Sequence, residues 1–190
     1  MSPEEMPAVP EDRLDAGGWE RVEETTETVF QLPTAKVEGH TLLFEDGNLR
    51  ERVIEAGGDD RTWRFFFATT LSFHPPLAPG VSTMVKPTVV TEARDRFADD
   101  LRKRGFENID RGRTQTIRAE SDARIRLSQY RARLVVSETR LTISGFLGVW
   151  YDDDFYIAGG AYPESGLETW VDTDPEGYRD ELLELIRAVG

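Results

Sequence analysis

Four consecutive β-strand patterns between Arg113 and Tyr162 constrain the fold of this chain more than any other feature of its sequence. Apolar residues alternate with polar ones through each stretch, and turn residues separate the stretches. The predicted strands span residues 114–119, 123–136, 141–151 and 155–162. Because the links between them are too short for a crossover connection, we expect an antiparallel meander.

Two amphipathic segments predict helices around this meander. Thr91 is a suitable N-cap for a helix that ends at Arg104, before Gly105. Asp174 and Pro175 begin a second helix with an N-cap and a first-turn proline. Each helix has one apolar stripe, and each stripe has to cover a face of the sheet.

The N-terminal half adds further strands. Residues 61–73 form a long apolar pattern typical of a central strand, and residues 29–32 and 38–44 predict two shorter ones. Residues 49–54 predict either a returning strand or a short helix. The predicted fold class is therefore α+β: a curved, mainly antiparallel sheet of about six to seven strands, flanked by two main helices.

The acidic N-terminus predicts a tail. Nine acids, two arginines and few apolar residues occupy residues 1–28. We expect residues 1–27 to be a flexible tail and residues 28–190 to be a single domain. The proline-rich connection from His74 to Pro87 should be neither a helix nor an interior strand.

Two local irregularities suggest a strongly shaped sheet. The apolar positions of the strand 123–136 change from odd to even numbers near Ser128, which predicts a β-bulge. Four glycines occupy two adjacent strands, and we expect them to allow sheet curvature. They are Gly145, Gly148, Gly159 and Gly160.

The charge balance excludes several functions. The chain has 36 acids, 23 bases and a net charge of −13, which disfavours nucleic acid and anionic membranes as partners. It has no cysteine, so disulfides and thiolate metal sites are excluded. No apolar run is long enough to span a bilayer, and the N-terminus has no secretory signal. We expect a cytoplasmic protein without a metal or other cofactor.

The basic residues are mainly arginine, since only Lys36, Lys86 and Lys103 are lysines. An acid-rich, lysine-poor composition resembles that of haloarchaeal cytoplasmic proteins, in which molar salt screens the repulsion between carboxylates. A GC-rich genome favours arginine codons as well, so both interpretations stay open.

The segment from Arg113 to the C-terminus resembles the PsbP-like superfamily. The resemblance rests on the strand meander, the run Asp154-Phe155-Tyr156-Ile157-Ala158 leading to Ala161-Tyr162-Pro163-Glu164, and the final helix ending in Leu-Ile-Arg. It implies an α/β sandwich with a curved antiparallel sheet between helices. It also implies a binding or accessory role, because most members of that superfamily are not enzymes.

Arginines concentrate in residues 111–133, which carry a net charge of +5. Such a patch could bind a small anionic ligand or an acidic protein. Alternatively, these side chains face solvent and pair with acids on neighbouring strands. The candidate binding residues are Arg118, Arg124, Arg126, Arg131 and Arg133.

His74 is the remaining candidate, because it precedes a proline-rich loop that could border a pocket. No nucleophile lies at motif spacing from it. The run Asp152-Asp153-Asp154 indicates a solvated hairpin turn rather than a cation site, since its spacing does not suit oxygen ligation.

The function hypothesis is a non-catalytic binding or accessory domain. The alternative is a small-molecule hydrolase or isomerase that uses the concave sheet face, with His74 and an acid such as Glu92 as acid–base groups. A homodimer built on an exposed sheet edge is compatible with both hypotheses.

Overall fold

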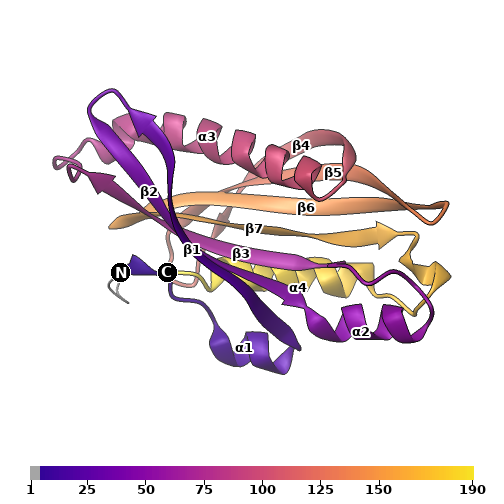
Figure 1. Cartoon of the computed structure of the whole chain (residues 1–190). Helices are drawn as coiled ribbons and strands as arrows, with labels where there is room; N and C mark the ends of the chain where they lie inside the picture. The colour runs from indigo at the N-terminus through magenta and orange to yellow at the C-terminus, as the bar shows by residue number, and fades with distance from the viewer. Residues whose placement is uncertain (1–4) are drawn as a thin grey trace.

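A seven-stranded antiparallel sheet forms the body of the molecule, in a computed structural model that describes residues 5–190 (Figure 1). The strand order is β1-β2-β3-β7-β6-β5-β4, so β1 and β4 are its edges. The strands are β1 (Trp19–Leu32), β2 (Ala35–Asp46), β3 (Phe65–His74), β4 (Glu107–Arg118), β5 (Arg124–Val136), β6 (Thr139–Asp152) and β7 (Asp154–Ser165). The predicted α+β class, antiparallel pairing and number of strands are confirmed.

Two long helices cover opposite faces of this sheet: α3 (Ser82–Lys103) and α4 (Pro175–Arg187). Phe97 and Leu101 of α3 belong to one buried cluster, whereas Leu182 and Ile186 of α4 belong to another. The sheet therefore separates two cores. Shorter elements complete the chain: α1 (Glu11–Ala16), α2 (Gly47–Glu55) and the 3₁₀ turn η2 (Leu167–Thr169).

Helix α4 begins where the sequence predicts. The Asp174 side chain accepts a hydrogen bond from the Gly177 backbone N–H, and Pro175 is the first helical residue. The side chain thus satisfies one of the backbone donors that a helix N-terminus leaves free.

Helix α3 is longer than predicted, because it begins at Ser82 and contains Pro87. The proline cannot donate the hydrogen bond to the Thr83 carbonyl, and its ring crowds that carbonyl. Val89 and Val90 follow it and are buried in the core on the α3 side. The packing of these valines explains why the helix continues through Pro87, which we expected to lie in a non-helical connection.

The predicted N-terminal tail is replaced by ordered elements over most of its length. Helix α1 packs with Leu14 buried, and β1 runs beside β2 from Trp19 onward. Only its end, residues 29–32, was predicted as a strand. The earlier part was missed because β1 lies at a sheet edge, where charged side chains are common and discourage pairing with other chains. The first four residues of the expected tail lie outside the described residues.

The predicted irregularity near Ser128 has a different cause from the one expected. Strand β5 pairs with β6 without a register shift. The pair of β4 and β5 has two register shifts, and the one nearest Ser128 lies on β4 between Arg111 and Thr114. Ile125 and Leu127 pack on the α4 side, whereas Tyr130 and the apolar residues after it pack on the α3 side. The buried face of β5 changes because each half of the strand lies under a different helix.

Glycine in β6 and β7 permits close approach of neighbouring groups. A Cβ atom on Gly160 would lie 2.1 Å from the Phe65 carbonyl oxygen and 2.9 Å from Leu182 Cδ1. One on Gly148 would lie 2.8 Å from Ile125 Cγ2 and 3.3 Å from Ile186 Cγ2. These glycines therefore permit close contact with an adjacent strand and with α4.

Candidate functional site

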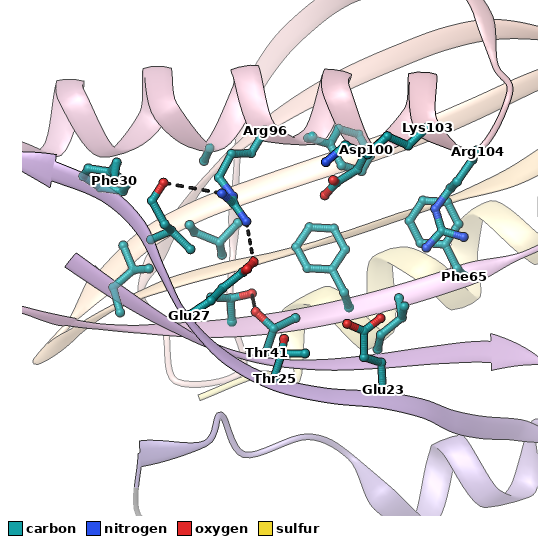
Figure 2. Close-up of a pocket in the computed structure, with 18 residues that line it drawn as sticks. Glu23, Thr25, Glu27, Phe30, Thr41, Phe65, Arg96, Asp100, Lys103 and Arg104 are labelled. Carbon is teal, nitrogen blue, oxygen red and sulfur yellow. Dashed lines mark hydrogen bonds and ion pairs between the residues drawn. The ribbon is translucent and has the colours of Figure 1, made fainter. Parts of the chain in front are cut away.

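A cavity of about 470 Å³ lies between α3 and the sheet face formed by β1, β2 and β3 (Figure 2). We call it the α3 cleft. This volume is within the range of small-molecule sites in proteins, roughly 300–1,000 Å³. The cleft is lined by Glu23, Thr25, Glu27, Val29, Phe30, Thr41, Leu43, Phe65, Phe67, Thr69, Leu71, Ala93, Arg96, Phe97, Asp100, Lys103, Arg104 and Ile157.

The floor of the α3 cleft is apolar and rich in aromatic rings. Phe67 of β3 and Phe97 of α3 contact each other with ring centroids 5.9 Å apart. Phe67, Leu43 and Phe30 are only half-buried, although they face the helix side of the sheet. Their accessible area lines the cleft, where an apolar ligand would remove it from water.

Threonine hydroxyls add polar groups to this floor. Thr41 Oγ1 and Thr69 Oγ1 lie 2.7 Å apart and share a hydrogen bond across β2 and β3. Thr25 lines the cavity from β1. Because a hydroxyl both donates and accepts, these groups can bind carbonyl or hydroxyl groups of a ligand.

An ion pair joins the two sides of the α3 cleft. Arg96 Nη2 of α3 donates to Glu27 Oε1 of β1 over 2.6 Å, and its Nη1 donates to the Val29 carbonyl oxygen over 3.4 Å. These contacts tie the edge strand to the helix at one end of the cavity. The pair is partly exposed, so it contributes about 0–1 kcal/mol to stability.

Arg104 and Glu23 face the cavity from opposite sides. The Arg104 guanidinium carbon lies 3.8 Å from the centroid of the Phe65 ring, a cation–π contact. Burial lowers the pKa of this guanidinium, although nearby acids, among them Asp100 and Glu23, act in the opposite direction. Within residues 5–190, no carboxylate lies within 4.0 Å of the Arg104 guanidinium, so it can receive an anionic group.

Asp100 is the acid of α3 that lines the cleft. Desolvation raises the pKa of its carboxyl above the usual value, despite the attraction of Arg96, Lys103 and Arg104. A carboxyl with a raised pKa in a cleft can exchange a proton nearer to neutral pH than an ordinary aspartate. The whole lining carries three acids and three bases, which makes the cleft amphipathic without a net charge.

His74 lies apart from the α3 cleft. It ends β3, its side chain is 53% exposed, and its Nε2 lies 3.3 Å from Oε2 of Glu38. Glu38 also pairs with Lys36 at 2.7 Å. The structure therefore places a carboxylate beside His74, but at the surface and outside the residues that line the cavity.

The candidate arginines divide between the two faces of the sheet. Arg118 and Arg124 are directly opposed in the β4–β5 pair, and Arg126 follows on the same face, the α3 side. Arg118 is held by Asp122, with Nη1 and Oδ1 3.0 Å apart. Arg131 and Arg133 lie on the other face of β5, because strand residues of odd and even number point to opposite sides. The five arginines do not form one patch.

Arg131 is bound within the chain. Its Nη2 donates to Oε1 of Glu164 over 2.7 Å, and Ser144 donates to Oε2 of the same carboxylate over 2.7 Å. Burial acts to raise the pKa of Glu164, but the hydrogen bonds from Ser144 and Arg131 outweigh it and hold that pKa below its usual value. Arg131 is therefore paired with an acid of the sheet, as the alternative interpretation expected, although Glu164 lies on β7, two strands away across β6.

Arg94 of α3 contacts the strands β4 and β5, although it was not among the candidate residues predicted from the sequence. Its guanidinium donates to the Ser128 hydroxyl at 3.1–3.2 Å and to Thr114 Oγ1 at 3.4 Å. Burial lowers the pKa of Arg94, and the charges of Arg111 and Arg126 lower it further. The α3 side of β4 and β5 is thus positively charged around hydroxyl groups.

The acidic hairpin Asp152-Asp153-Asp154 is the turn between β6 and β7. Asp153 adopts a positive φ of 62°, and Asp152 lies directly opposite Asp154 in the register of β6 and β7. In residues 5–190, no cluster of three or more acidic, histidine or cysteine residues is arranged to hold a metal ion.

The residues of the α3 cleft follow two separate patterns in the sequence, one on a helix and one on a strand. Arg96, Asp100, Lys103 and Arg104 recur at spacings of four, seven and eight, which places them along one side of α3. Glu23, Thr25 and Glu27 alternate as in a strand, but they fell within the expected tail. Only the position of β1 beside the helix brings the two sets together.

The comparisons with known proteins identify a family. The family profile of DUF6517, a domain of unknown function, matches residues 6–190, and the chain belongs to this family. No curated protein matches the sequence. Over residues 5–190, every helix is too short or too polar to cross a membrane.

Proposed function

We propose that this chain is a non-catalytic binding domain whose α3 cleft holds a small amphipathic molecule. The observation that carries the proposal is the cavity itself, about 470 Å³ with half-buried Phe30, Leu43 and Phe67 in its lining. Apolar side chains left accessible inside a concave site favour a ligand that removes them from water.

The lining suggests the chemical class of the ligand. An apolar or aromatic body fits against Phe67, Leu43 and Phe97, and its polar groups reach the hydroxyls of Thr41 and Thr69. One anionic group would pair with Arg104, whose guanidinium is partly desolvated. The ligand class is therefore an apolar small molecule that carries a single acidic group.

The architecture supports a binding role as well. An antiparallel sheet with one long helix on each face is the arrangement that a PsbP-like resemblance implies, and most members of that superfamily bind rather than catalyse. A relationship to that superfamily is part of this proposal. Fold alone does not define function, so the cleft carries the argument.

The proposal is tested with the fluorescent probe 1-anilinonaphthalene-8-sulfonate, which has an aromatic body and one anionic group. We expect saturable binding with enhanced fluorescence. Thr25→Trp should weaken it by about tenfold or more, because the indole would fill the cleft from β1 without disturbing the buried core.

Thr28→Trp is the matched control, since Thr28 lies on the same strand, is exposed and does not line the cleft. Arg104→Gln should weaken binding of the anionic probe, but should not change the affinity for an uncharged aromatic analogue. Absence of saturable binding, or equal loss in both tryptophan variants, would contradict the proposal.

An acid–base enzyme is the second candidate, and Asp100 is the observation that favours it, because its carboxyl has a raised pKa in the cleft. This candidate replaces His74 with Asp100 as the proton-transferring group. It is tested by hydrolysis of 4-nitrophenyl esters. Turnover that Asp100→Asn abolishes, with probe binding retained, would support catalysis; no turnover by the unmodified chain would favour binding alone.

The setting and the assembly are also proposals. The net charge of −13 and the scarcity of lysine favour a salt-rich cytoplasm. The edge strand β4 is exposed along most of its length, which favours a homodimer formed along that edge. Measurement of the mass in solution tests the dimer, and a monomer at all concentrations would exclude it.

A further inference from the structure

A second, smaller cavity lies on the opposite face of the sheet, between β4, β5, β6 and α4. Its volume is about 130 Å³, room for about four water molecules at about 30 Å³ each. The lining residues are Arg113, Gln115, Leu127, Gln129, Phe146 and Arg179. We call it the α4 pocket, and its position makes it independent of the α3 cleft.

The pairing of the strands explains how these side chains converge. Gln115 is directly opposite Leu127, and Gln129 is directly opposite Phe146, so each pair shares a sheet face. Arg113 lies at the β4 bulge, where the register shifts between Arg111 and Thr114. A bulge changes the direction of a side chain, and here it brings Arg113 to the side that faces α4.

The polar lining contains no acid; its guanidinium groups only donate hydrogen bonds, and its side-chain amides both donate and accept them. Two guanidinium groups and two side-chain amides surround a base formed by the buried Leu127 and Phe146. Among residues 5–190, neither Arg113 nor Arg179 has a carboxylate within 4.0 Å. Glu164, an acid of β7, is already held by Arg131 and Ser144.

This absence of acids contrasts with the rest of the chain, where acids outnumber bases by 36 to 23. Eight other arginines form an ion pair with a carboxylate, among them Arg13, Arg50 and Arg102, whereas Arg113 and Arg179 are exposed and form none among the described residues. Two unpaired guanidiniums on one small cavity produce a local positive potential that an anion would neutralise. Planar guanidinium forks bind two oxygens of one anion at once, and amide N–H groups complete such a site.

We propose that the α4 pocket binds a tetrahedral oxyanion, the phosphate group, through Arg113 and Arg179 with Gln115 and Gln129 as further donors. The volume of the pocket fits one such group, while the organic part of a phosphate monoester would extend to the open side. The ligand is therefore either inorganic phosphate or a small phosphate monoester, and the experiment distinguishes them.

The test is calorimetric titration of the full chain with inorganic phosphate, sulfate and glycerol 3-phosphate, at constant ionic strength set with potassium chloride. We expect saturable one-site binding of phosphate, and competition by sulfate. Tighter binding of glycerol 3-phosphate assigns a monoester as the ligand, whereas tighter binding of inorganic phosphate assigns the free ion.

Arg113→Gln and Arg179→Gln should each lower the affinity for phosphate by about tenfold or more, since each removes a charge-assisted hydrogen bond. Arg140→Gln is the matched control: it removes one exposed arginine from β6 that does not line the pocket, and should leave affinity unchanged. Thermal unfolding in chloride alone confirms that the variants are folded. No saturable heat with phosphate, or affinities equal in all three variants, would overturn the proposal.

Discussion

Arg64 donates a hydrogen bond from Nη1 to Oδ2 of Asp46 over 2.7 Å, and both side chains are almost completely buried. The guanidinium carbon lies 4.2 Å from the centroid of the Tyr178 ring and 4.8 Å from that of Trp19. Asp46 also accepts a hydrogen bond from the Leu49 backbone N–H, which caps α2. One ion pair thus links β1, the start of α2 and the helix α4.

Removal of Arg64 should destabilise the protein strongly. Arg64→Met leaves the buried Asp46 carboxylate without its cation, and we expect a loss of about 3–5 kcal/mol in the free energy of unfolding. Arg13→Met is the control, because Arg13 forms a 2.7 Å pair with Glu120 in which both side chains are about half-exposed; its loss should be about 0–1 kcal/mol. Urea denaturation measures both, and equal losses would show that burial does not decide the effect.

Gly160→Ala should also destabilise the fold. The added Cβ would lie 2.1 Å from the Phe65 carbonyl oxygen, so β7 and β3 would have to separate. We expect a loss of about 1–3 kcal/mol or more. Gly112→Ala is the control, since the nearest atom to its Cβ would be the Gln129 carbonyl oxygen at 3.9 Å. Thermal unfolding compares the two, and a Gly160→Ala protein as stable as the control would contradict close strand approach.

Asp100→Asn should stabilise the protein near neutral pH. Because desolvation raises the folded-state pKa of Asp100, ionisation is less favourable in the folded chain than in the unfolded one. Stability is therefore greatest below the unfolded-state pKa and falls as the pH rises through the folded-state pKa. The variant removes this loss, so its advantage should be present at about pH 7 and absent at about pH 3.

Thermal unfolding at the two pH values measures this difference. Asp99→Asn serves as control, because Asp99 lies one residue away, pairs with Arg102 at 2.6 Å and does not line the cleft. The Asp99→Asn variant should show no increase in thermal stability at about pH 7. A destabilised Asp100→Asn protein near neutral pH would show that attraction to Arg96, Lys103 and Arg104 outweighs desolvation.

The sequence predicted the elements whose signals are local. The cap at Asp174, the turn at Asp153 and the alternation through β6 and β7 depend on neighbouring residues, and the structure has all of them. The start of α3 and the first ten residues of β1, which precede the predicted strand 29–32, were missed for tertiary reasons. Val89 and Val90 pack in the core after Pro87, and the acidic β1 is stabilised by pairing with β2 rather than by its own residues.

The candidate sites were less predictable because they depend on which elements meet. The α3 cleft requires Glu27 of β1 to face Arg96 of α3, a contact between residues 69 positions apart. The arginines of β5 looked like one patch in the sequence, but Arg126 and Arg131 lie on opposite faces of the sheet. Their division follows from the two helices that cover the two halves of the strand.

The salt response should distinguish halophilic adaptation from an ordinary acidic composition. Screening by salt reduces the self-repulsion of a chain with net charge −13, which stabilises the folded state. It also weakens exposed ion pairs such as Arg102–Asp99 and Arg13–Glu120, which has the opposite effect. If the first effect dominates, as halophilic adaptation requires, the melting temperature should rise steeply from about 0.1 M to about 2 M potassium chloride.

Sucrose at matched osmolality is the control for exclusion of solute from the protein surface, and should give a smaller rise in the melting temperature. A flat or falling response to potassium chloride would attribute the arginine-rich composition to codon usage instead.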